Sequence, residues 1–259
     1  MLFDTHTHLN EIRLFGELDN VYREATKAGV SLMLVPSYDI PSCERALLIA
    51  NKYQNVYAAL GIHPSDVKNY PDSVINDLEN LLKSSDKVKA LGEIGLDYHW
   101  DTDPELRSRQ RIMFIKQIEL ANNLKLPVII HMRDADEDTV ATLKATTPEF
   151  GFVMHCYSGS LEIALELIKL GGYISLGGPV TFTNAKTPKE IAKNIPLSRL
   201  LIETDSPYLA PHPFRGQMNY PSYIKLVCEE IANTRGITPE EVAKATRDNA
   251  CNVFHVESI

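Results

Sequence analysis

The stretch Leu2-Phe3-Asp4-Thr5-His6-Thr7-His8 opens the chain and is the first of a series of apolar runs that decide the fold. Leu2 and Phe3 predict a short first strand. Side chains alternate between the two faces of a strand, so His6 and His8 are expected on one face, about 7 Å apart. Two imidazoles at that spacing can bind one metal ion, although paired histidines also occur on solvated faces or as hydrogen-bonded core groups.

Seven further apolar runs follow, separated by segments whose apolar residues recur at helical spacing. A helix is expected to end at Gly29, and a long one to begin at Asp103-Pro104. Apolar runs that alternate with helices are typical of a parallel sheet buried on both faces, and eight such units favour a (β/α)8 TIM barrel over an open doubly wound sheet. The strands expected after the first lie at 31–36, 56–62, 88–94, 127–131, 151–155, 173–177 and 200–205.

No linker, low-complexity tract or block of charge divides the chain, so we predict one barrel domain over residues 1–259. A long irregular stretch rich in proline, 206–221, follows the eighth strand. Loops that follow barrel strands are the ones that build active sites in this fold.

The composition excludes some classes of protein. The chain is 44% hydrophobic and 23% charged, and its net charge of −8 comes from scattered acidic residues, so no general basic surface for coating nucleic acid is expected. A polyanionic substrate would have to be held locally. The four cysteines form no CxxC pair, and neither a signal peptide nor an apolar stretch of membrane-spanning length is present. These features predict a cytoplasmic protein with no membrane partner, and no obligate protein partner is evident.

Polar residues able to bind metal lie at the C-terminal ends of the expected strands. A barrel gathers such strand ends around one axis at its catalytic face. Four histidines and two carboxylates are enough to hold two divalent cations, with one carboxylate bridging them. Each residue alone has a simpler explanation, as a helix cap or a core histidine, but all six together favour a metal centre. The predicted ligands are His6, His8, Glu93, His131, His155 and Asp205.

Several motifs in this order resemble those of the TatD family of metal-dependent deoxyribonucleases, in the amidohydrolase superfamily, and the match runs nearly end to end. The motifs are Asp4-Thr-His-Thr-His8, Gly61-Ile-His-Pro64, Gly92-Glu-Ile-Gly-Leu-Asp-Tyr98, His131-Met-Arg-Asp-Ala135, His155-Cys-Tyr-Ser-Gly159 and Glu203-Thr-Asp-Ser-Pro-Tyr-Leu-Ala-Pro211. The resemblance implies that the same six residues bind two divalent metals, with Glu93 as the bridge. It also implies exonucleolytic cleavage of DNA from the 3′ end.

Two positions depart from the family pattern, and neither is a predicted metal ligand. Many members carry a second histidine where this chain has Ser65, and many have serine where Met132 stands. Both positions concern how a substrate is held.

Three further residues are candidates for substrate contacts. His63, on the loop after the third strand, could contact a phosphate or donate a proton, or its His-Pro pair could simply form a turn. Arg133 has a guanidinium fork suited to phosphate oxygens, with an ion pair to Asp134 or Glu137 as the alternative. Arg215, in the loop after the eighth strand, is another candidate for binding an anion.

The hypothesis from sequence is a hydrolase that cleaves phosphodiester bonds of DNA with two divalent cations, Mg²⁺, Mn²⁺ or Zn²⁺. Asp205 is the expected base and, with Glu93, the expected catalytic pair. The alternative within enzymes is amide, ester or phosphotriester hydrolysis on the same metal set, since fold alone does not choose the reaction. A non-catalytic metal-storing or nucleic-acid-binding scaffold is the alternative from another class.

Overall fold

Eight parallel strands form the centre of the computed structural model, which describes residues 1–257. Each strand pairs with the next one along the chain. A helical segment between them returns the chain to the end of the barrel where the strands begin, so the next strand runs parallel to the last. The predicted (β/α)8 barrel is confirmed, while the predicted domain limit at residue 259 lies outside the described residues. The strands are β1 Leu2–Asp4, β2 Val30–Pro36, β3 Val56–Leu60, β4 Val88–Asp97, β5 Val128–Arg133, β6 Phe152–Met154, β7 Tyr173–Leu176 and β8 Leu200–Ile202.

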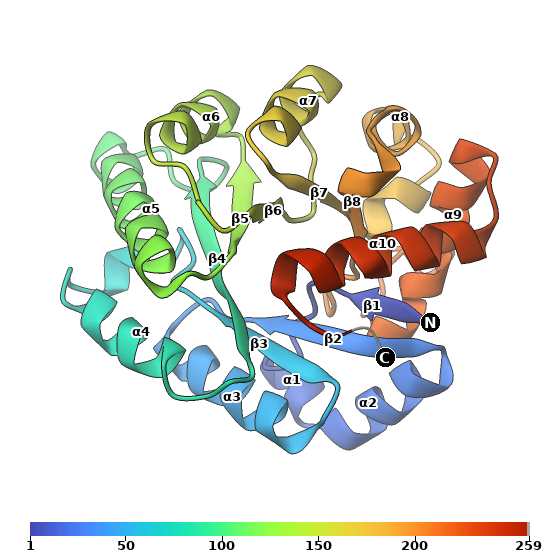
Figure 1. Ribbon diagram of the computed structural model, residues 1–259, viewed down its shortest axis with the longest axis horizontal. Coiled ribbons are helices and arrows are strands. Elements are labelled where there is room, and N and C mark those ends of the chain that lie inside the picture. Colours follow the sequence, from blue (N-terminus) through green and yellow to red (C-terminus); the bar gives the residue numbers. More distant parts are fainter. Residues whose placement is uncertain (258–259) are drawn as a thin grey trace.

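The helices form a ring outside the strands (Figure 1). The long helix predicted after Asp103 is present, and its first turn is capped because the Asp103 side chain accepts a hydrogen bond from the backbone N–H of Glu105. The short helix α1 was not predicted. The helices are α1 Ile12–Phe15, α2 Leu18–Lys27, α3 Ile40–Lys52, α4 Val74–Leu82, α5 Pro104–Leu124, α6 Asp136–Ala145, α7 Leu161–Lys169, α8 Lys186–Asn194, α9 Ile224–Arg235 and α10 Pro239–Phe254.

All eight strands contribute to one buried apolar cluster inside the ring. It contains Phe3, Leu32, Leu34, Ala59, Ala90, Ile129, Val153, Tyr173 and Leu201. Residues of α10 and the turn after it, among them Phe254 and Val256, belong to the same cluster. Helix α10, which lies across the strands in Figure 1, therefore seals the barrel at the end away from the C-termini of the strands. The opposite end is left for polar residues.

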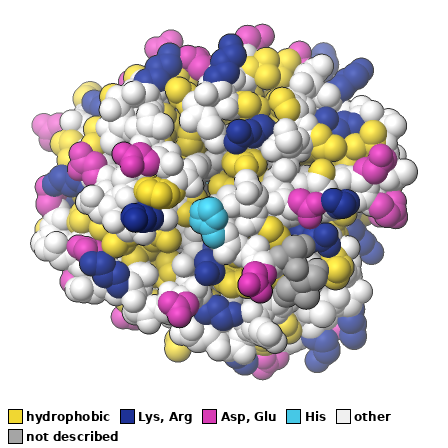
Figure 2. Space-filling view, in the orientation of Figure 1, with side chains coloured by type: hydrophobic (Ala, Val, Ile, Leu, Met, Phe, Trp, Pro, Cys, Tyr) yellow, Lys and Arg dark blue, Asp and Glu magenta, His cyan; other side chains and the backbone are white. Residues whose placement is uncertain are grey.

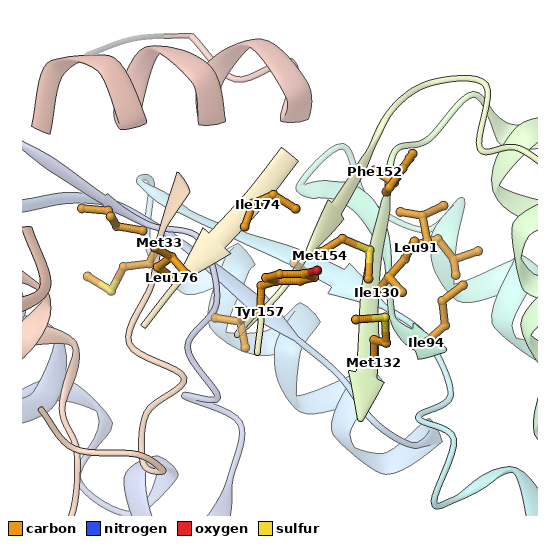
Figure 3. Close-up of a cluster of buried hydrophobic side chains, with 14 of the residues drawn as sticks. Met33, Leu91, Ile94, Ile130, Met132, Phe152, Met154, Tyr157, Ile174 and Leu176 are labelled. Carbon is orange, nitrogen blue, oxygen red and sulfur yellow. The ribbon is translucent and has the colours of Figure 1, made fainter. Parts of the chain in front are cut away.

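The intervening strand residues face outward, toward the helices. Met33, Leu91, Ile130, Met154 and Ile174 belong to this second cluster, part of which is drawn in Figure 3. Because both faces of the strands are buried, the sequence shows continuous apolar runs rather than an alternating pattern.

The ring closes between β1 and β8 without a regular ladder. Thr7 and Ser206 form an isolated parallel bridge, and the backbone N–H of Asp205 donates to the carbonyl of His6 at 2.8 Å. The buried carboxylate of Asp4 accepts hydrogen bonds from the backbone N–H of Thr204 at 2.9 Å and from its hydroxyl at 2.6 Å. This seam thus joins the first and the last strand just where predicted ligands lie.

The surface agrees with the scattered charges of the sequence. Acidic and basic side chains are interspersed over the face shown in Figure 2. Within residues 1–257, no helix is both long enough and apolar enough to cross a membrane.

Candidate metal centre

Two of the predicted ligands reach the barrel interior through simple strand alternation. Ile129 and Val153 belong to the interior cluster, so the residues two positions later, His131 and His155, also point inward. The Nδ1 atom of His131 lies 3.2 Å from the Nε2 atom of His155. Strand β5 and the residue directly after β6 therefore place two imidazoles side by side above the apolar layer. The prediction that His155 and Asp205 lie on strands six and eight is wrong, because β6 ends at Met154 and β8 at Ile202.

Glu93 reaches the interior in a different way. Ala90 points inward from β4, so regular alternation would turn Glu93 outward. The pairing of β4 with β5 shifts register between Leu91 and Ile94, and an irregularity of this kind re-aims a side chain. The Glu93 carboxylate is consequently buried among the histidines, with its residue only 3% exposed.

The expectation that His6 and His8 lie on the first strand is wrong, because β1 ends at Asp4. Their side chains nevertheless meet, with the two Nε2 atoms 3.1 Å apart. The chain beyond β1 is fixed by the seam with β8, where the backbone N–H of His8 donates to the carbonyl of Ser206 at 2.8 Å. Barrel closure, rather than strand alternation, brings these two imidazoles together.

The two carboxylate oxygens of Glu93 face two different sets of histidines. Oε2 lies 3.3 Å from His6 Nε2 and 3.6 Å from His8 Nε2. Oε1 lies 2.8 Å from His155 Nε2 and 2.9 Å from His131 Nδ1. One carboxylate is therefore shared by two potential ligand groups, which is the arrangement a bridging ligand needs.

Asp205 completes the cluster from the seam. Its Oδ1 atom lies 3.5 Å from His8 Nε2 and 3.8 Å from His6 Nε2. The backbone at Asp205 is left-handed, with φ of 55°, a conformation that aspartate and asparagine adopt more readily than most residues. All six residues predicted as ligands thus lie in one cluster.

The chemistry of the donor set fits divalent cations. Imidazole nitrogens only 3.1 and 3.2 Å apart need a proton or a cation between them, because two bare acceptors repel. The Nδ1 atoms of His6 and His8 are buried without a hydrogen-bond partner. Nitrogen and carboxylate donors in this mixture suit Zn²⁺ or Mn²⁺ well, while Mg²⁺ prefers oxygen.

Charges within the cluster shift the pKa values of its members. Burial alone would raise the pKa of Glu93, but the positive charge of His155 beside it outweighs burial and holds the pKa well below its usual value. Burial alone would lower the pKa of His155, but the negative charges of Glu93 and Glu203 beside it hold the pKa well above its usual value. Without a cation, this pair is therefore ionic at neutral pH.

A consequence is that cation binding should release protons. At pH 7 the raised pKa of His155 keeps the imidazole protonated, and a cation must displace that proton, so affinity should rise with pH. We expect the apparent enthalpy of Mn²⁺ binding at pH 7 to differ between two buffers with different heats of ionisation. The His99→Ala variant is the control and should behave like the wild type, since His99 pairs with the exposed Asp134 outside the cluster. Equal enthalpies in both buffers would contradict the expectation.

Two carboxylates beside the ligands were missed at the sequence level. Asp97 Oδ2 lies 3.0 Å from His131 Nε2, and Glu203 Oε1 lies 3.4 Å from His155 Nδ1. Carboxylates in such positions fix the orientation of a ligating imidazole. Glu203 could have been found because it stands two residues before Asp205, and Asp97 because β4 runs on to it.

The three candidates for substrate contacts lie at different distances from the cluster. His63 Nε2 lies 3.5 Å from Glu93 Oε1, and its ring stands edge-on to His131. Arg133 is exposed at the edge of the cluster, and within residues 1–257 it forms no ion pair, so neither predicted alternative partner holds it. Its guanidinium lies 5.4 Å from the Trp100 ring. The guanidinium of Arg215 instead lies 4.4 Å from the centre of the Phe182 ring. Arg215 lines neither of the two cavities that adjoin the cluster.

A cluster of histidines and carboxylates at the C-terminal end of a barrel has the ligands that a metal-dependent hydrolase needs. The chain belongs to the TatD family, since the family model described as TatD related DNase matches residues 3–255. The resemblance seen in the motifs is thereby confirmed.

Relatives match over their whole length. The chain is 46% identical to the uncharacterized metal-dependent hydrolase YabD of Bacillus subtilis, covering 99% of this chain and 100% of that protein. It is 38% identical to the metal-dependent hydrolase YcfH of Escherichia coli, over 99% and 97% of the two chains. The crystal structure of YjjV, a TatD homologue from Escherichia coli, superimposes with a TM-score of 0.93 at 33% identity, covering 99% of this chain and 98% of that one.

Proposed function

We propose that this chain is a deoxyribonuclease that hydrolyses phosphodiester bonds at free 3′ ends with two divalent cations. The observation that supports it most directly is that the two carboxylate oxygens of Glu93 face separate groups of histidines. The family model, described as TatD related DNase, supports DNA as the substrate. The cytoplasmic location expected from the sequence stays a prediction.

The proposed roles follow from position. His6, His8 and Asp205 would hold one cation and His131 and His155 the other, with Glu93 between them. Bound there, the cations would lower the pKa of a shared water and neutralise charge on the phosphoryl oxygens. Burial would raise the pKa of Asp205, but a hydrogen bond with His8 and the charge of His6 lower it, so its carboxylate is ionised and able to accept a proton.

Amide, ester or phosphotriester hydrolysis is the second candidate on this site. Arg133 favours the phosphodiester reaction, because an exposed guanidinium beside the cluster, with no ion-pair partner among residues 1–257, suits an anionic substrate. A neutral amide or ester gives such a group nothing to bind. With a net charge of −8, the protein is expected to engage DNA only locally.

Digestion of end-labelled single- and double-stranded oligonucleotides tests the proposal. We expect release of nucleotides from the 3′ end with Mg²⁺ and with Mn²⁺, and none after chelation. Arg133→Ala should lower kcat/KM by roughly tenfold, the effect of losing one charged hydrogen bond of about 1.5–3 kcal/mol, discounted for solvent exposure. Arg215→Ala is the matched comparison and should have the smaller effect, because Arg215 covers Phe182. Rapid amide or ester cleavage, with no nucleotide released under any metal, would favour the second candidate.

A further inference from the structure

Two hollows adjoin the candidate metal centre. One opens directly over it and has Glu93 and His8 in its lining, and the other lies beside it. Both are bordered by His131, Arg133, His155, Asp205 and Tyr208. The first, of about 380 Å³, is lined mainly by polar residues such as His63, Ser65 and Asp66. A substrate whose phosphate lies at the cluster in this hollow could therefore extend a neighbouring group into the second hollow.

The second hollow is apolar and has no role in the reaction described above. It has a volume of about 460 Å³, within the range of about 300–1,000 Å³ found for small-molecule sites. We call it the apolar chamber. Its walls include Met132, Tyr157, Leu176, Val180, Tyr208 and Leu209. Met132, Tyr157 and Leu176 are among the buried hydrophobic side chains labelled in Figure 3.

We propose that the apolar chamber receives the base of the nucleotide next to the bond that is cut. This inference rests on the proposed nuclease function. The flat, uncharged group nearest to the phosphate of a nucleotide is its base. Moving the two faces of the base out of water and onto apolar side chains is favourable. Arg133, at the border of both hollows, is placed for the phosphate between the base and the cluster.

Away from the metal centre, most of the chamber wall is apolar, and the side chains of Cys156, Ser158 and Tyr208 are the polar groups on it that could distinguish one base from another. The hydroxyl of Tyr157 donates to the carbonyl of Ser160 at 2.8 Å, so this side chain offers its ring rather than a free hydrogen-bonding group. Leu176 and Val180 are buried and wholly apolar. Binding by apolar contact and stacking tolerates every base, because each base has a π-face. The chamber should therefore recognise the presence of a base and not its identity.

Filling the chamber tests this. Leu209→Phe narrows its outer edge, where Leu209 is 43% exposed and a larger side chain has room, while Val180→Phe fills it more deeply. Leu48→Phe is the matched control, because Leu48 is exposed on α3 and lines neither hollow beside the cluster. The substrates are two oligonucleotides that differ only in the 3′-terminal residue, which is thymidine in one and an abasic tetrahydrofuran residue in the other.

The wild type and Leu48→Phe should cleave the base-bearing end roughly tenfold faster in kcat/KM than the abasic end, as expected for one stacked base. In Leu209→Phe and Val180→Phe this ratio should fall to near one. A ratio that is near one in the wild type, or that survives in the filled variants, would overturn the assignment of the chamber.

A binding measurement separates this inference from the proposed function. Calorimetric titration of the Mn²⁺-loaded proteins with thymidine 5′-monophosphate should show binding to the wild type and to Leu48→Phe, and roughly tenfold weaker binding to Leu209→Phe. If no oligonucleotide is cleaved but this pattern holds, the chamber is supported and the nuclease proposal fails. If DNA is cleaved but the nucleotide binds all variants alike, the nuclease proposal stands and the chamber assignment is overturned.

Discussion

The Asp205→Asn variant should fold normally and lose hydrolysis by at least about 10²-fold in kcat, the usual cost of removing a general base. The amide cannot accept a proton, and it lacks the charge with which Asp205 faces His6 and His8. The fold should survive because asparagine tolerates the left-handed backbone at this position, where φ is 55°. Steady-state kinetics on an oligonucleotide and thermal unfolding by circular dichroism measure the two effects separately.

Asp134 provides a matched control for this substitution. Its backbone is also left-handed, with φ of 52°, but its exposed carboxylate pairs with His99 outside the cluster. Asp134→Asn should therefore leave kcat within a few-fold of the wild type. An Asp205→Asn enzyme that retains activity to the same degree would make Asp205 a bystander.

The Glu93→Gln variant should lose at least one of two bound cations. Reconstitution with excess Mn²⁺ followed by elemental analysis should give close to two equivalents for the wild type and one or fewer for the variant. The reason is that both oxygens of Glu93 lie among histidine nitrogens, within 3.3 Å of His6 and 2.8 Å of His155. An amide replaces one of them with a donor that cannot bind a cation.

Glu79→Gln is the control for the loss of one glutamate charge, since Glu79 pairs with Lys83 on the exposed face of α4. Its cation content should equal that of the wild type. A wild type that never exceeds one equivalent, or a Glu93→Gln variant that keeps two, would refute the bridge.

The sequence was sufficient where side-chain position follows from strand periodicity. His131 and His155 stand at even spacing from interior residues, so their meeting could be predicted from β5 and β6 alone. The barrel itself was predictable because eight buried parallel strands leave eight apolar runs.

Prediction failed where long-range structure overrides the local pattern. Glu93 points inward because of a register shift between Leu91 and Ile94 that no periodicity reveals. The correct pairing of His6 with His8 was predicted for the wrong reason, since β1 is too short and contacts with Ser206 direct the chain instead. The sequence makes both Arg133 and Arg215 candidates for binding an anion, because it does not show that the Arg215 guanidinium covers Phe182. Its role as a substrate contact stays a prediction.

The seam between β1 and β8 ties the metal centre to the order in which the chain folds. The hydrogen bonds between Asp4 and Thr204 join residues 200 positions apart. Contacts so distant in sequence pay the largest loop-closure entropy and tend to form late. His6, His8 and Asp205 lie on the two sides of this seam, so no partly assembled barrel can present the full set of donors. The capacity to bind the cation proposed for His6, His8 and Asp205 would thus arise only with the final closure of the ring.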